Sequence, residues 1–145
     1  MHKLSKKVQK IVDLKKRFDD LRKGKEALLT ILEDVELAES VYNSNAIENS
    51  TLTLPDTEKI LLDLEVSKDY SLREVFEAKN LARVYEYIRA KKDSIVLNQE
   101  TILFIHGLLI GGIDDAIAGR FRKQYEYVRV GKHIAPAPEH VIRMM

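Results

Sequence analysis

The chain has 145 residues, of which 45% are hydrophobic and 32% are charged, and its formal net charge is +1. This length and balance fit one soluble globular domain with its own core, and they exclude a wholly disordered chain. The sequence contains no cysteine, which excludes disulfide bonds and thiolate metal sites. No apolar run is long enough to span a membrane, and no signal peptide follows the basic start, so we expect a cytoplasmic protein.

The basic residues are concentrated at the start of the chain. Residues 1–25 contain ten Lys or Arg and three Asp, whereas the other 120 contain fourteen Lys or Arg and twenty Asp or Glu. Such a segment could bind nucleic acid or an acidic partner. Because its charges alternate with apolar residues at helical spacing, we favour a solvated helix face and do not expect nucleic acid to be its partner.

Two helices are predicted in the first third of the chain. From Leu4 to Leu21 apolar residues recur every three or four positions, which predicts an amphipathic helix that Gly24 closes. A second apolar stripe begins near Glu26 and predicts a helix that runs to about Asn49, where a stretch rich in hydroxyl groups ends it.

Two further helices have clear N-terminal signals. Thr53 followed by Pro55 is typical of a capping residue and a first-turn proline. Ser71 and Glu74 have the spacing of a capping box, and the apolar pattern after them predicts a helix that extends to about Lys91.

The next predicted helix is the most apolar segment of the chain. It begins after Asn98 and ends at Gly111, and residues 102–110 are apolar on nearly every side. We therefore expect it to be the most buried helix. His106 lies in this helix, and we assign it to packing because a histidine in so apolar a helix is more often structural than catalytic.

After residue 123 the sequence pattern changes from one typical of helices to one typical of strands. Residues 124–130 alternate aromatic or β-branched with polar side chains, Gly131 and Lys132 supply a turn, and residues 133–135 form a return strand. Residues 139–145 look like the first turns of another helix, and we expect the chain to stop within that element. The predicted fold class is therefore all-α with one β-hairpin.

Common motifs of enzymes and metal sites are missing from this sequence. It contains no glycine-rich phosphate-binding motif and no H-E-x-x-H zinc motif. No two of the four histidines stand at helical i, i+4 spacing with a carboxylate companion, so we expect no metal site. By these tests the chain is no self-sufficient enzyme.

One short pattern stands apart at the end of the second predicted helix. Ser44 and Glu48 are four residues apart, so both lie on the same helix face, and Asn49 follows at the helix end. A carboxylate in this position could reach across a cleft to an arginine and form a bidentate pair. Taken alone, the pattern also fits an ordinary surface glutamate with a nearby serine.

The order of four motifs along the chain resembles the Fic family, in the subclass whose inhibitory helix precedes the catalytic core. Ser44-x-x-x-Glu48-Asn49 resembles the inhibitory motif [ST]-x-x-x-E-[GN], and Leu52-Thr53-Leu54 follows it as in the family. Ile105-His106-Gly107-Leu108-Leu109 resembles the family's helix with its H-x-x-L element. Gly119-Arg120-Phe121-Arg122 resembles the G-x-[FY]-R that precedes a β-hairpin flap. Together these matches cover roughly residues 30–145.

The resemblance implies an incomplete Fic-like helical domain with one hairpin flap. Residues 26–145 would form its N-terminal part, with the inhibitory helix at about 26–49 and the flap at about 124–135. Residues 1–25 would form a separate amphipathic helix. The family's signature, H-x-F-x-[DE]-G-N-G-R-x-x-R, does not occur in the sequence. The resemblance therefore implies no catalytic residue in this chain, no ATP or Mg²⁺ bound by it alone, and no activity alone.

The resemblance also implies a function for the complete enzyme. Fic enzymes transfer AMP from ATP, with Mg²⁺, to a Ser, Thr or Tyr hydroxyl of a protein substrate, and a homodimer is compatible with this. Glu48 would pair with the second arginine of the signature and keep ATP from binding productively. Ser44 would help to fix Glu48, and Asn49 would shape the helix end.

The hairpin would be the flap that docks the target protein by strand addition. The residues assigned to it are Tyr127, Val128, Arg129, Val130, Gly131, Lys132, His133 and Ile134. A purely structural hairpin fits the sequence equally well. Two other functions remain open: a stand-alone regulatory module like an antitoxin, against which the flap and residues 119–122 argue, and a helical module that binds protein or nucleic acid.

Overall fold

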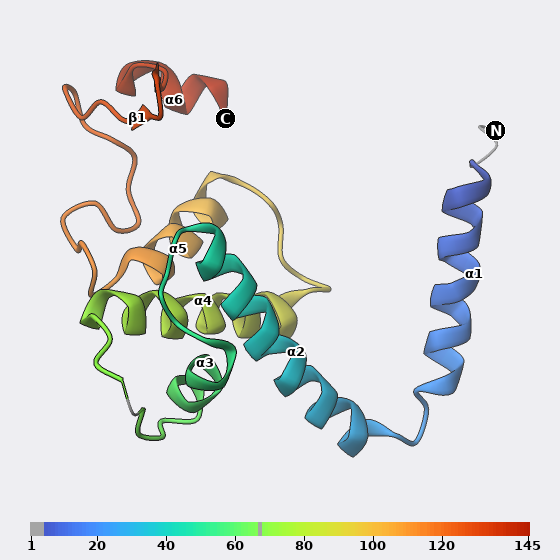
Figure 1. Ribbon diagram of the computed structural model, residues 1–145. Helices are drawn as coiled ribbons and strands as arrows, with labels where there is room; N and C mark the ends of the chain where they lie inside the picture. The colour runs from blue at the N-terminus through green and yellow to red at the C-terminus, as the bar shows by residue number, and fades with distance from the viewer. Residues whose placement is uncertain (1–4, 67) are drawn as a thin grey trace. The chain divides into compact units, whose positions relative to one another are not determined.

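The computed structural model describes residues 5–66 and 68–145. Its elements in chain order are the helices α1 (Lys6–Leu21), α2 (Glu26–Ile47), α3 (Leu54–Leu61), α4 (Leu72–Lys91) and α5 (Gln99–Ile110), the strands β1 (Arg129–Val130) and β2 (His133–Ile134), and the helix α6 (Pro138–Met144) (Figure 1). The predicted class, all-α with one hairpin, is confirmed. None of the described helices has both the length and the apolar character that crossing a bilayer requires.

The chain divides into two compact units, Met1–Glu36 and Leu37–Met145, and the boundary lies inside α2. In the first unit α1 begins two residues after the predicted start at Leu4, which lies outside the described residues. Ser5 caps α1, because its hydroxyl accepts a hydrogen bond from the Val8 N–H at 3.4 Å. No residue of α1 is buried.

In the second unit the predicted helix starts are confirmed. Thr53 accepts a hydrogen bond from the Asp56 N–H at 3.3 Å and caps α3. Ser71 and Glu74 form the expected capping box at the start of α4. Asn98 accepts a hydrogen bond from the Thr101 N–H at 2.8 Å and caps α5. These starts were predictable because each cap depends on residues only three positions apart.

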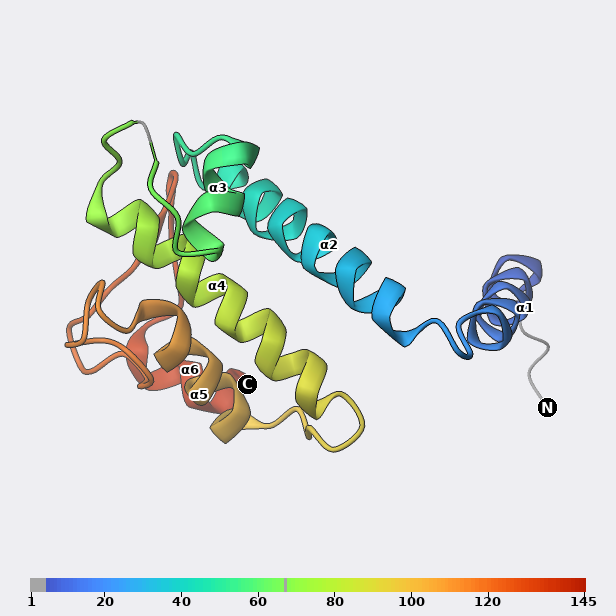
Figure 2. The same cartoon turned by 90° about the horizontal axis from the view of Figure 1, so that it is seen from below.

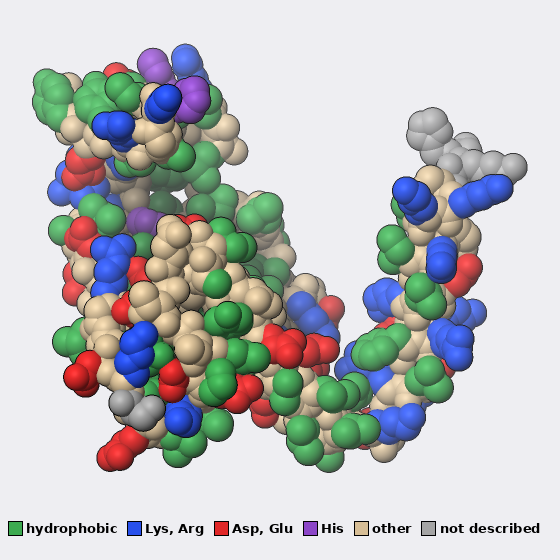
Figure 3. Space-filling view, in the orientation of Figure 1, with side chains coloured by type: hydrophobic (Ala, Val, Ile, Leu, Met, Phe, Trp, Pro, Cys, Tyr) green, Lys and Arg blue, Asp and Glu red, His purple; other side chains and the backbone are tan. Residues whose placement is uncertain are grey.

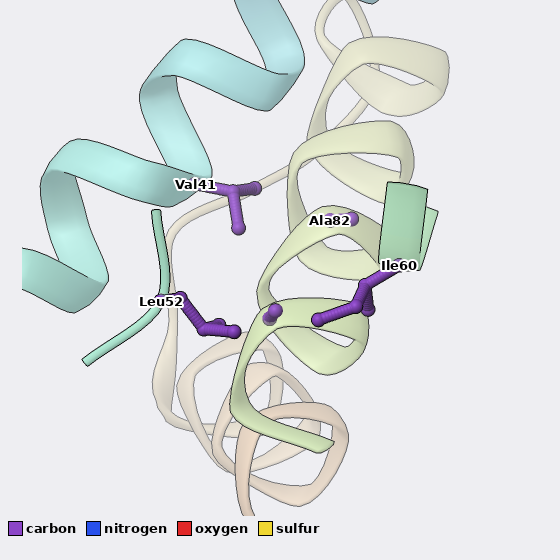
Figure 4. Packing of buried hydrophobic residues seen from close by; sticks show 5 residues of the cluster. Val41, Leu52, Ile60 and Ala82 are labelled. Carbon is purple, nitrogen blue, oxygen red and sulfur yellow. The ribbon is translucent and has the colours of Figure 1, made fainter. Parts of the chain in front are cut away.

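The core of the second unit is built around the small residues of α4. Val41 from α2, Leu52 from the connecting turn and Ile60 from α3 are buried against Ala78 and Ala82 (Figure 4). Alanine has no side chain beyond Cβ, so neighbouring elements can approach the α4 backbone closely. This packing places the end of α2 and the turn after it beside α4.

A buried amide side chain of α4 is hydrogen-bonded to the end of α5, and the two helices lie side by side (Figure 2). Asn80 is only 1% exposed, and its Nδ2 donates hydrogen bonds to the carbonyl oxygens of Leu109 at 3.0 Å and Gly111 at 2.8 Å. The last carbonyl groups of a helix have no partner within the helix. Asn80 therefore both caps the C-terminal end of α5 and fixes its position along α4.

The expectation that α5 is the most buried helix is wrong. No residue of α5 is buried and Phe104 is 49% exposed, whereas α4 contains four buried residues. An apolar sequence indicates that a helix favours burial, but burial also needs neighbours on every side. The described residues cover α5 only in part, and open grooves lie on two of its sides.

The predicted long strand over residues 124–130 is also wrong, because β1 contains only two residues, which pair with β2 in the register Arg129 to Ile134 and Val130 to His133. Tyr125 adopts a positive φ of 73°, which breaks the extended conformation. The Glu126 carboxylate accepts a hydrogen bond from Arg120 in the preceding loop. A side-chain contact that sequence alternation does not reveal therefore shortens the strand.

We predict that Asn80→Leu lowers the free energy of unfolding by about 2–3 kcal/mol, because it leaves two carbonyl groups at the end of α5 without their donors. Chemical denaturation of the 145-residue chain measures this change. Asn43→Leu, at an exposed position of α2, is the control and should change stability by about 0.5 kcal/mol or less. Equal effects of the two substitutions would contradict the assigned role of Asn80.

Candidate functional site

A groove of ≈ 850 Å³ lies in the second unit, between the end of α2, the first turns of α4 and the end of α5. Its walls combine polar groups from the end of α2, the turn after it and α4 with apolar side chains from α5 and the turn that follows α5. The residues that line the groove include Ser44, Asn45, Glu48, Asn49, Thr51, Arg73, Glu74, Glu77, Leu109 and Ile113. The structure thus brings the three predicted inhibitory residues, Ser44, Glu48 and Asn49, into one groove.

The helix end that presents Glu48 is defined by two backbone hydrogen bonds. The Asn49 N–H donates to the Ala46 oxygen at 3.1 Å, and the Ser50 N–H donates to the Asn45 oxygen at 3.0 Å. With Asn49 at φ 65°, this is a Schellman motif in which Glu48 is the last residue before the left-handed position. Glycine and asparagine are the residues that tolerate this position best. The geometry explains why one of them suits the place after Glu48.

The turn after α2 is tied to α4 by the Glu74 carboxylate. One oxygen of Glu74 accepts hydrogen bonds from the Thr51 N–H at 2.7 Å, the Thr51 hydroxyl at 2.8 Å and the Ser50 hydroxyl at 3.4 Å. The other oxygen accepts from the Ser71 N–H at 3.2 Å and the Ser71 hydroxyl at 2.8 Å. Glu74 therefore completes the cap of α4 and holds the residues that follow Glu48.

These donors stabilise the ionised form of Glu74. The Thr51 N–H, the Ser71 hydroxyl and the Thr51 hydroxyl, in that order, lower the pKa of Glu74 from 4.5 to about 2. Hydrogen bonds to a carboxylate favour its charged form. Glu74 therefore stays charged at neutral pH, and its negative charge lies in the same groove as Glu48.

The Glu48 carboxylate is exposed and makes no hydrogen bond or ion pair with any other residue that the structure describes. The one arginine lining the groove, Arg73, is paired with Glu77, its Nε lying 2.8 Å from the Glu77 carboxylate. Ser44 is half-buried in the same wall, but no hydrogen bond joins its side chain to Glu48. Among the described carboxylates of the groove, Glu74 and Glu77 thus have partners within the chain, whereas Glu48 has neither a hydrogen-bond donor nor a cation beside it.

Sequence reasoning missed Asn45, which lies one position after Ser44. Its side chain is 7% exposed, and its Nδ2 has no hydrogen-bond partner in the described part of the chain. A buried donor without an acceptor is costly. The sequence contained a signal for this residue. Asn45 lies four positions after Val41, on the buried side of α2, where the other residues are aliphatic or aromatic.

A second groove of ≈ 460 Å³ lies along another side of α5, and the predicted flap borders it. Arg120 anchors the loop before the hairpin: its Nη1 and Nη2 lie 2.7 and 2.8 Å from the two oxygens of Glu126. Arg120, and after it the Lys123 N–H, lower the pKa of Glu126 to about 2. Arg122 donates to the Pro136 oxygen at 2.9 Å and so closes the base of the hairpin.

The structure does not bring Glu48 and the hairpin into one site. Leu109 lines the Glu48 groove, whereas Leu103 and His106 line the groove that Tyr127 and Val128 border. All eight residues assigned to the flap, 127–134, are exposed. Each strand therefore keeps one edge free for a further strand.

His106 makes a structural contact in the described chain. Its Nδ1 accepts a hydrogen bond from the Gly119 N–H at 3.1 Å. A Cβ added to Gly107 would lie 3.4 Å from the Gly119 Cα, so the two glycines let the loop approach α5 closely. This contact fits a packing role, and it joins residues of two motifs that are thirteen positions apart along the chain. The described residues contain no cluster of three potential metal ligands.

We predict that Glu74→Gln destabilises the chain by about 1–3 kcal/mol at pH 7, because the carboxylate that accepts five hydrogen bonds is lost. A carboxylate whose pKa is lowered on folding stabilises the fold above its unfolded pKa, and this contribution is lost as the pH falls. The difference in stability between the two proteins should therefore shrink between about pH 5 and pH 2.

Denaturation at a series of pH values measures this difference. Glu86→Gln, at an exposed position of the same helix, is the control and should behave like the unsubstituted protein throughout. A difference between the Glu74 variant and the unsubstituted protein that stays constant down to pH 2 would contradict the role assigned to its charge.

Comparison with known proteins identifies relatives of this chain. It is 32% identical over 136 residues to a protein of Culex quinquefasciatus named Protein adenylyltransferase Fic, with 85% of this chain and 26% of that protein covered. A protein of the same name from Drosophila melanogaster is 31% identical over 106 residues, with 72% of this chain and 21% of that protein covered. The chain thus spans about a quarter of the length of these curated relatives. No family model matches the chain.

Comparison with solved structures gives a consistent result for the fold. A Fic family protein from Desulfovibrio desulfuricans G20 matches with a TM-score of 0.72 and 24% sequence identity. The match covers 99% of this chain and 44% of that one. The chain is therefore a distant relative of the Fic family and has the fold of the corresponding part of a Fic family protein.

Proposed function

We propose that this chain is the N-terminal, autoinhibitory part of a Fic-type protein adenylyltransferase, and that Glu48 blocks productive binding of ATP. One observation carries the proposal: the Glu48 carboxylate stands at the end of α2, open to a groove and unmatched by any described cation. The names of the relatives, Protein adenylyltransferase Fic, supply the reaction.

The electrostatics of the groove favour an arginine as the partner of Glu48. The C-terminal end of a helix carries a partial negative charge, so a carboxylate there is unfavourable unless a cation compensates it. The charged Glu74 adds to the same negative field. A guanidinium group supplies positive charge and two parallel donors, which match a carboxylate in geometry. An arginine held in this way is unavailable to a nucleotide phosphate, and the carboxylate repels that phosphate.

In the complete enzyme, a target hydroxyl oxygen would attack the α-phosphorus of ATP, and pyrophosphate would leave. The histidine of the family signature would take the hydroxyl proton, and Mg²⁺ would neutralise the phosphates. This sequence contains none of the signature residues. Its own contribution would be regulatory through Glu48, with Ser44 and Asn49 shaping the helix end that presents it.

The hairpin would dock the protein substrate. Residues 127–134 are exposed and β1 and β2 each pair on one side only, so an extended segment of a target could add as a further strand. The ion pair between Arg120 and Glu126 and the bond from Arg122 to Pro136 hold the base of the hairpin while its tip stays accessible.

We predict that Glu48→Gly, in a protein extended through the family signature, raises auto-adenylylation about tenfold to a hundredfold. A hydrogen bond to a charged group contributes about 1.5–3 kcal/mol. Losing the pair between Glu48 and the arginine would therefore raise the fraction of arginine that is available to the nucleotide by about tenfold to a hundredfold. Incorporation of labelled AMP measures the effect.

Two controls accompany this measurement. Glu65→Gly, at an exposed loop position, should leave activity unchanged. The 145-residue chain with Glu48→Gly should transfer no AMP, because it lacks the signature. Unchanged activity of the extended Glu48 variant would refute the assignment of Glu48.

We also predict that Asn49→Ala and Asn49→Gly have different effects. Alanine at a positive φ is strained, so Asn49→Ala should cost about 1 kcal/mol of stability. Glycine adopts this conformation freely, so Asn49→Gly should cost a few tenths of a kcal/mol at most. Thermal unfolding of the two variants measures the difference. Equal stabilities would show that the helix end does not depend on the left-handed residue.

A further inference from the structure

Asn45 lies where the core of the second unit meets the groove that Glu48 faces. Val41, four positions earlier on α2, is completely buried, and Glu48, three positions later, is exposed. Residues three or four positions apart lie on the same side of a helix. Asn45 is 7% exposed and lines the groove, so its amide is almost removed from water at the border between core and groove.

The amide nitrogen of Asn45 has no acceptor. Its Nδ2 makes no hydrogen bond within the described part of the chain. A buried donor without an acceptor costs free energy, and most buried polar side chains of folded proteins are paired. The χ2 torsion of asparagine is soft, so Nδ2 can turn towards an acceptor that enters the groove. The isolated chain thus carries the cost of burying this amide without the hydrogen bond that would offset it.

The charges around the groove decide which class of acceptor suits Asn45. Glu48 and Glu74 both line the groove, the end of α2 adds a partial negative charge, and the described arginine of the groove is paired with Glu77. Figure 3 shows Asp and Glu side chains along α2, which contains five of them and no Lys or Arg. This negative field disfavours a carboxylate or a phosphate as the acceptor. A neutral acceptor is compatible with it, and every residue of a peptide supplies one in its main-chain carbonyl group.

We propose that Asn45 is a positioning residue for the inhibitory contact, and that its Nδ2 donates a hydrogen bond to a main-chain carbonyl group of the segment that supplies the arginine. The inference rests on the proposed inhibition by Glu48 and adds a second contact to it. The ligand of the groove would be a basic peptide segment held at two points. The Glu48 carboxylate would bind its guanidinium group, and the Asn45 amide would bind its backbone.

The spacing of the two groups suits one short segment. Side chains three positions apart on a helix have Cβ atoms about 5–6 Å apart. Consecutive Cα atoms of a chain are about 3.8 Å apart, so a segment that bears the arginine offers more than one carbonyl group over this distance. A backbone fixed by Asn45 reduces the freedom that the arginine loses when it pairs with Glu48. Inhibition should therefore weaken when the amide is removed.

Thermal unfolding of the 145-residue chain gives the first test. Asn45→Leu removes the unpaired amide and keeps a side chain of similar size, so the melting temperature should rise by about 2–6 °C. A purely structural role of the amide predicts a fall instead. Asn45→Ala is made in parallel, because leucine can overpack a buried site. A lower melting temperature for both variants would show that the amide is already satisfied, for instance by a buried water, and would overturn the proposal.

Auto-adenylylation of the protein extended through the family signature gives the second test. The Asn45 variant that keeps or raises the melting temperature should increase the incorporation of labelled AMP about threefold to tenfold, because the arginine is held less firmly. Asn43→Leu, at an exposed position of the same helix, is the control and should change neither the activity nor the melting temperature. In a Glu48→Gly protein the Asn45 substitution should add no further increase, because the arginine is already free.

These measurements separate the inference from the proposed function. Higher activity of Glu48→Gly without higher activity of the Asn45 variant would overturn the inference and leave the role of Glu48 intact. A further increase when the Asn45 substitution is added to Glu48→Gly would also overturn it, because Asn45 would then act outside the inhibitory contact. Unchanged activity of Glu48→Gly itself would remove the proposed function, and the inference with it.

Discussion

The position of Glu48 depends on the Glu74 carboxylate, which lies on a different helix. Glu74 caps α4 through Ser71 and at the same time holds Thr51 and Ser50, the residues that follow the end of α2. Buried contacts among Val41, Leu52 and the alanines of α4 support the same junction. The direction in which α2 ends, and hence the groove that Glu48 faces, is therefore set by one charged side chain and a small apolar core.

At this junction several negative charges lie close together, and this arrangement fits a regulatory role. A charged Glu74, a negative helix end and the Glu48 carboxylate share one groove, and its one described arginine is paired with Glu77. Such an arrangement is poor for the stability of the isolated chain but strongly favours a cation from outside the described residues. Sites that violate the rules of stability in this way are often functional.

Much of the local structure could be predicted from the sequence, because it depends on neighbours along the chain. The caps at Thr53, Ser71 and Asn98 are examples, since each acceptor and donor are three residues apart. The contact between Thr51 and Glu74 spans 23 positions and left no local signal beyond the capping box. The burial of α5 was mispredicted because it depends on contacts across the fold. The length of β1 was mispredicted because Tyr125 adopts a positive φ and Glu126 pairs with Arg120, six residues earlier, neither of which the alternation of side chains reveals. The grouping of Ser44 and Glu48 followed from helical periodicity, whereas Asn45 and the separation of Glu48 from the hairpin needed the structure.

The central claim is that the Glu48 carboxylate forms a bidentate ion pair with an arginine of the nucleotide site. A crystal structure of the protein extended through the family signature, solved without nucleotide, tests this directly. Our account predicts that both Glu48 oxygens lie within about 3 Å of the guanidinium nitrogens of the second signature arginine. A Glu48 side chain that points into bulk solvent, with that arginine bound elsewhere, would contradict it.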